Sequence, residues 1–83
     1  MKLADALLEK RELDNGYALR LPGEMFEQAC ETMAIERRCC GFLSIRLEVV
    51  GGSSDLWLSL EGPPGTKQVL DSELALILGG RNL

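Results

Sequence analysis

Residues 43–61, LSIRLEVVGGSSDLWLSLE, contain two runs in which apolar and polar residues alternate. One side of each run is apolar: Leu43, Ile45, Leu47 and Val49 in the first, and Leu56, Leu58 and Leu60 in the second. Such alternation is typical of β-strands with one buried side and one side toward solvent. Residues 51–55, GGSSD, favour a turn between the runs. The stretch therefore predicts two successive antiparallel strands.

A helix is predicted on either side of this pair. In residues 22–40, PGEMFEQACETMAIERRCC, proline and glycine mark the start of a helix and Gly41 marks its end. In residues 62–80, GPPGTKQVLDSELALILGG, a helix begins after the prolines and stops at the final glycines. Its apolar stripe contains one acid and consists of Val69, Leu70, Glu73, Leu74, Ile77 and Leu78.

The N-terminal part resembles a β-hairpin. Residues 11–23, RELDNGYALRLPG, contain an Asn-Gly pair between alternating residues, which is a turn signal. We expect a three-residue loop, Asp14 to Gly16, which sets Leu13 opposite Tyr17, with a strand over at least residues 8–13. In the alternative, residues 3–13 form a helix that Gly16 caps, because Ala, Leu, Glu and Lys favour helices.

The predicted order of elements is ββαββα in one domain spanning residues 1–83. The fold class is α+β: a two-layer sandwich in which two helices pack on one face of an antiparallel four-stranded sheet. A domain of this size buries only about 60% of its unfolded surface, so association would help its stability. The second face of the sheet is expected to carry Ala18, Arg20, Phe42, Ser44, Arg46, Glu48, Trp57 and Ser59.

The composition of the chain excludes several classes of function. The net charge of −4 argues against nucleic acid, because phosphate binding needs clustered Lys and Arg. No apolar run reaches the roughly 18 residues of a membrane span, and residues 1–10 lack the apolar core of a signal peptide. Three cysteines, an odd number, favour reduced thiols in the cytoplasm. The chain has no histidine, which excludes Ser–His and Cys–His catalysis and His-ligated zinc within one chain.

The main candidate for chemistry is the vicinal pair Cys39–Cys40, with Glu36 one turn upstream. Two adjacent thiols can bind a soft ion such as Hg(II), Cu(I) or As(III), which needs few ligands. Cys30 cannot join them on a regular helix, because it lies about 180° from Cys39. In the alternative interpretation Cys40 packs as a small core residue and Cys39 has no role. A catalytic cysteine is disfavoured, because Glu36 is the only base nearby and is too weak to ionise a thiol near neutral pH.

The second face of the sheet is the other candidate. Phe42 and Trp57 would expose large apolar surface there, which small domains rarely tolerate. A two-fold contact with a second copy is the commonest solution, so we expect a homodimer, with Arg20 and Arg46 at the polar rim. The working hypothesis is a binding module, not an enzyme, that requires no cofactor. It either captures a soft metal or other thiophile at Cys39–Cys40, or binds a partner or small ligand on this face.

The motifs ERRCCGFLSIRLEV and LWLSLEGPPGTKQVL resemble a group of small bacterial proteins with no settled activity. Their pattern is E-x-x-C-C-x-F-L, then a glycine-rich turn and L-x-L-x-x-G-P-x-G, and the likeness extends over residues 7–78. Some members are associated with mercury-type metal-resistance regulators, which would imply soft-metal or oxidant handling. The chain departs from the pattern at Gly41, where proline is common, and at Ile45, where an aromatic is common. Gly41 would loosen the turn that holds the thiols.

Overall fold

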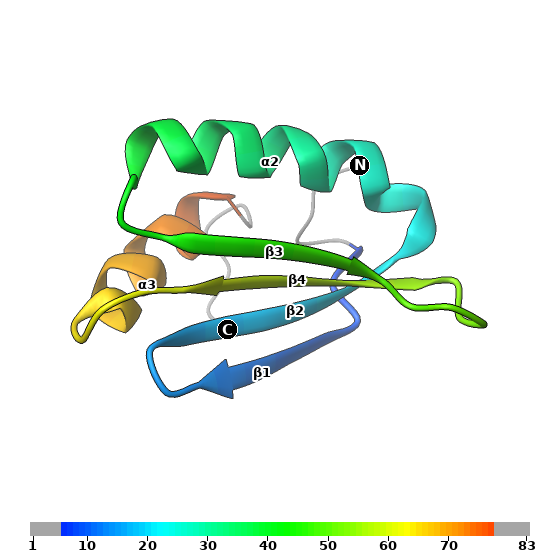
Figure 1. The fold of residues 1–83 in the computed structure, drawn as a ribbon, viewed down its shortest axis with the longest axis horizontal. Coiled ribbons are helices and arrows are strands. Elements are labelled where there is room, and N and C mark those ends of the chain that lie inside the picture. Colours follow the sequence, from blue (N-terminus) through cyan, green and yellow to red (C-terminus); the bar gives the residue numbers. More distant parts are fainter. Residues whose placement is uncertain (1–5, 78–83) are drawn as a thin grey trace.

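The computed structural model describes residues 6–77 and has an α+β fold (Figure 1). Its elements follow in the order β1 (Glu9–Leu13), β2 (Gly16–Pro22), the 3-10 turn η1 (Gly23–Met25), α2 (Phe26–Cys39), β3 (Ser44–Val49), β4 (Asp55–Glu61) and α3 (Thr66–Ile77). The strands form one antiparallel sheet in the order β1-β2-β4-β3. The α+β class, the four-stranded antiparallel sheet and the two helices are confirmed. The predicted end of the second helix at residues 79–80 lies outside the described residues.

The core forms where the apolar sides of the inner strands meet. Leu19 of β2 lies opposite Leu58 of β4, which lies opposite Leu47 of β3. Opposed residues of an antiparallel sheet point to the same face, so these leucines share one side. Ala29 of α2 and Leu70 of α3 belong to the same buried cluster. Both helices therefore contribute to a single core. Neither is long and apolar enough to cross a membrane within the part of the chain described.

The first hairpin is a strand pair, but its register differs from the prediction. Leu13 pairs with Gly16 and Glu12 with Tyr17, so the turn contains only Asp14 and Asn15. Leu13 therefore points to the face opposite that of Tyr17. The expected three-residue loop is wrong, and so is the helical alternative over the described residues 9–13.

The physical reason for the shorter loop lies at Gly16. A Cβ atom built there would lie 2.0 Å from the carbonyl oxygen of Leu60 in β4. Gly16 also does not have a positive φ, in contrast to Gly52 and Gly65. The glycine thus serves the close approach of two strands and is not needed for the turn itself.

This register places charged residues of β1 on the core side, where α3 meets the sheet. Lys10 Nζ lies 4.2 Å from the centre of the Tyr17 ring, and Lys67 Nζ of α3 lies 5.6 Å from it. The Tyr17 hydroxyl donates a hydrogen bond of 2.6 Å to Asp71 Oδ1, and Lys67 is 3.9 Å from Glu12. The hydrogen bond to the Asp71 carboxylate, together with burial, raises the pKa of Tyr17 to about 12. Polar contacts therefore attach α3 to the hairpin.

The helix α2 lies along β3 at the top of Figure 1. It follows Pro22 and the turn η1, and ends where Cys40 leaves the helical conformation at φ −129°. The backbone N–H of Cys40 donates to the carbonyl of Glu36 at 2.7 Å. The chain then reaches β3 through Gly41, Phe42 and Leu43. The helix thus ends close to Gly41, as predicted, whereas Phe42, expected on the second face of the sheet, lies in the connection before β3.

Candidate functional site

The vicinal cysteines lie on two sides of the helix end. Cys39 is the last residue of α2 and is exposed, whereas Cys40 is 5% exposed and belongs to the buried residues. Cys30 is exposed as well. Cys39 still belongs to α2, whereas the backbone at Cys40 leaves the helical conformation and turns toward β3, so the two neighbouring side chains differ in exposure. Only one member of the pair is open to a dissolved ion.

Glu36, the third residue of this candidate site, is buried at 2% exposure. Its side chain therefore belongs to the interior together with Cys40, and is separated from solvent, where Cys39 lies. Among residues 6–72, whose side chains the structure describes, no group of three or more Cys, Asp or Glu side chains is placed to hold a metal ion. Ions that need only two ligands are not covered by this finding, so the soft-metal site at Cys39–Cys40 stays a prediction.

The face of the sheet opposite the core leucines, here named the open face, carries charged and small side chains. By the strand register its residues are Glu9, Arg11, Leu13, Gly16, Ala18, Arg20, Pro22, Ser44, Arg46, Glu48, Asp55, Trp57, Ser59 and Glu61. Trp57 is partly buried, and the guanidinium of Arg11 lies 4.5 Å from its ring centre. This cation–π contact reduces the exposed apolar surface that the sequence led us to expect at Trp57.

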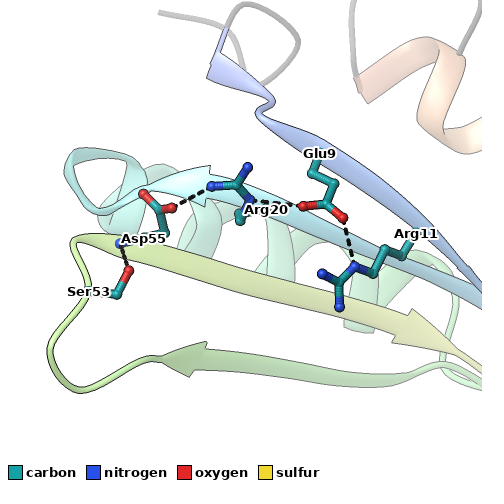
Figure 2. A network of polar contacts seen from close by, with 5 residues as sticks. All are labelled: Glu9, Arg11, Arg20, Ser53 and Asp55. Carbon is teal, nitrogen blue, oxygen red and sulfur yellow. Dashed lines mark hydrogen bonds and ion pairs between the residues drawn. The ribbon is translucent and has the colours of Figure 1, made fainter.

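A chain of ion pairs crosses the open face from β1 to β4 (Figure 2). Glu9 accepts hydrogen bonds from Arg11 at 2.7 Å and from Arg20 at 3.2 Å, and Arg20 donates to Asp55 at 2.6 Å. Ser53 accepts a hydrogen bond from the backbone N–H of Asp55. The bond from Arg11 lowers the pKa of Glu9, and the bond to Asp55 raises the pKa of Arg20. Arg20, predicted as an interface residue, is thus engaged within the chain.

Two open grooves lie over β3 and β4 and share Arg46. One, of about 540 Å³, is lined by Arg46, Leu47, Glu48, Trp57 and Ser59. The other, of about 470 Å³, is lined by Asp14, Asn15, Phe42, Ser44, Arg46, Glu61, Gly62 and Pro63. Arg46 also pairs with Glu61, while its side chain remains 67% exposed. The structure thus brings Arg46 and Trp57 together in one groove and sets Phe42 in the adjoining one.

Phe42 precedes β3 and is 45% exposed. A Cβ atom built at Gly62 would lie 3.3 Å from its ring, which places Phe42 beside the end of β4.

Glu9 and Arg11 were not predicted as part of the open face, because the expected three-residue loop assigned them to the other face of the sheet. No local signal in the sequence separates the two registers, because the close approach of Gly16 is to β4, a strand distant in the sequence.

Comparison with known proteins adds no assignment. No family model matches the chain, and no curated protein and no solved structure shows a significant similarity to it. The resemblance to bacterial proteins with the E-x-x-C-C-x-F pattern therefore stays a prediction.

Proposed function

We propose that the protein is a non-enzymatic binding module, cytoplasmic and homodimeric, in which both helices cover one face of the sheet. A ligand binds on the open face, in the groove beside Trp57. The single observation that carries this proposal is the groove lined by Arg46, Glu48, Trp57 and Ser59.

The side chains of this groove suit a ligand with mixed character. Trp57 offers the part of its indole that Arg11 leaves uncovered, and tryptophan is a frequent anchor in binding sites. Ser59 can donate or accept a hydrogen bond, whereas Arg46 and Glu48 present opposite charges. A peptide segment or small molecule with a flat apolar part and hydrogen-bonding groups fits this chemistry better than a polyanion does.

The groove can be tested by fragment screening with two-dimensional NMR of the labelled protein. We expect the shifts caused by binding fragments to cluster at Arg46, Trp57 and Ser59, and Trp57→Ala to weaken the same fragments about tenfold or more. Ile35→Ala is the matched control, because Ile35 is exposed on α2 and lines neither groove on the open face. Fragments that cluster elsewhere, or that bind Trp57→Ala equally well, would contradict the proposal.

Capture of a soft metal through Cys39 and Cys40 is the second proposal. The exposed position of Cys39, at the junction of α2 and the connection to β3, supports it. Binding through both sulfurs requires Cys40 to leave the interior, so metal uptake should be slow and should lower the stability of the fold. Titration with Hg(II), with Cys39→Ser and Cys40→Ser as separate variants, tests it. Tight uptake lost in both variants supports the pair, and uptake unchanged by either variant rules it out.

A further inference from the structure

The two edges of the sheet differ in how they are protected. At one edge, β1 carries four successive charged residues, Glu9 to Glu12, and such charges discourage pairing with another strand. At the other edge, β3 pairs only with β4, and no other described strand covers its second side. Its sequence SIRLEV alternates and contains no proline or glycine. Within the described part of the chain, the backbone hydrogen bonds of Ser44–Val49 all belong to the ladder with β4.

Apolar surface accompanies this open edge. Val49 of β3 is 62% exposed. A groove of about 280 Å³ lies between α2 and β3 and is lined mainly by apolar residues: Met33, Ala34, Arg37, Leu43 and Ile45. Because α2 lies along β3, a strand added to this edge would also cover the groove. An open backbone edge beside an apolar groove is the usual setting for strand addition.

We propose that two copies of this chain pair through their β3 edges, antiparallel about a two-fold axis at Leu47, and form a continuous eight-stranded sheet. The inference deepens the homodimer of the proposed function and rests on it. A two-fold contact is self-complementary, so the partner supplies the same strand.

The charges of β3 select this register. In a symmetric antiparallel pair, the residue on the axis lies opposite its own copy, and residues that share a face lie opposite each other. An axis at Arg46 would oppose two arginines, and an axis at Glu48 would oppose two glutamates, both unfavourable. An axis at Leu47 sets Arg46 opposite the partner's Glu48 twice, and sets Ile45 opposite the partner's Val49. The register with complementary charges also covers the exposed valine.

The existing bond between Arg46 and Glu61 is compatible with this arrangement. The Arg46 side chain is 67% exposed, and a guanidinium has five N–H donors, so it can hold Glu61 and the partner's Glu48 together. Arg46 and Glu48 both line the groove beside Trp57. In the dimer each such groove therefore adjoins the partner's β3, and the partner contributes charged side chains to the binding surface.

Sedimentation equilibrium over a range of protein concentrations tests the proposal with a charge-reversal cycle. We expect the parent chain to dimerise, and Arg46→Glu and Glu48→Arg each to raise the dimer dissociation constant about tenfold, because each variant creates two like-charge pairs. The double variant restores opposite charges and should recover the parent constant to within about threefold. Because Arg46→Glu also removes the bond to Glu61, thermal unfolding of each variant is measured in parallel.

A second variant keeps the test independent of those charges. Val49→Lys leaves the folded monomer intact, because the side chain is already exposed, but places lysine at the contact and should dissociate the dimer. Ile35→Lys makes the same change at an exposed site on α2 and should leave the dimer unaffected. A monomer at every concentration overturns the inference. If the protein dimerises and neither Val49→Lys nor the two charge-reversal variants change the dissociation constant, the β3 contact is wrong but the homodimer is retained. If each single charge-reversal variant weakens the dimer and the double variant does not restore the parent constant, the proposed register is wrong. Fragment binding beside Trp57 is measured separately and can succeed in each of these cases.

Discussion

Tyr17→Phe removes one hydroxyl from the junction of β2 and α3 and leaves the ring beneath Lys10 in place. The lost hydrogen bond to Asp71 is 2.6 Å long and has a charged acceptor. Bonds of this kind contribute roughly 1.5–3 kcal/mol. Asp71 is exposed, so water replaces part of the interaction and we expect a loss of about 1 kcal/mol. For a chain of 83 residues, with a total stability on the order of 4–12 kcal/mol, this loss is readily measured.

The same hydroxyl makes the stability depend on pH at the alkaline end. The pKa of Tyr17 is raised to about 12 from an ordinary value of 10.0, which also applies to the unfolded chain. Between these values the unfolded chain has released the phenolic proton and the folded chain has kept it. Raising the pH through this window therefore favours unfolding, and the contribution is fully present only below about pH 10. The advantage of the parent chain over Tyr17→Phe should shrink between about pH 10 and pH 12.

Urea unfolding of both proteins at neutral pH and at about pH 11 measures this difference, and the comparison cancels the titration of the lysines. The chain contains a single tyrosine, so its ultraviolet absorbance reports the pKa of Tyr17 directly. Asp71→Asn is the control: the amide still accepts a hydrogen bond but lacks the charge, and the pKa should fall toward 10.0. If the native phenol titrates at its ordinary value and Tyr17→Phe is as stable as the parent, the reasoning is refuted.

Three further outcomes follow from the structure. Gly16→Ala should destabilise the fold by more than about 2 kcal/mol, because the new methyl group overlaps the backbone of β4. Gly41→Ala should be neutral or should stabilise the fold by up to about 1 kcal/mol, because Gly41 has open space around it and no positive φ. Chemical unfolding of the two variants measures both changes. An alkylating reagent should label Cys39 in the native protein and Cys40 only in urea, as mass spectrometry of the digested protein would show; equal rates would contradict the burial of Cys40. Arg11→Ala should increase acrylamide quenching of the single tryptophan, because the guanidinium no longer covers the ring, and unchanged quenching would argue against that contact.

Much of the fold could be predicted because its signals are local. Alternation in residues 43–61 predicted β3 and β4 with Leu56, Leu58 and Leu60 inward, and all three are buried. Gly23 and Gly41 bracketed the first helix correctly. The hairpin register was predicted wrongly, because an Asn-Gly pair is compatible with several turns, and the close approach of Gly16 to β4 depends on a strand more than forty residues away.

The sequence predicted which residues belong to the candidate sites, but not which of their side chains are exposed or which other side chains cover them. Cys39 and Cys40 occupy the expected junction, but a sequence does not show which side of the helix end faces the interior. Trp57 was correctly expected on the open face, whereas Arg11, which covers it, comes from the strand whose register was missed. Strand order was not predicted at all, since nothing local indicates that β4 lies between β2 and β3.

The charged β1 edge has a consequence for the growth of such assemblies. In the proposed dimer, the outer strands of the enlarged sheet, as far as the described residues show, would be the two copies of β1, each carrying Glu9 to Glu12. A third molecule would have to dehydrate those charges to add itself. The proposed assembly would therefore stop at two subunits, and neutralising the acids and bases of β1 should turn a finite complex into a fibre-forming one.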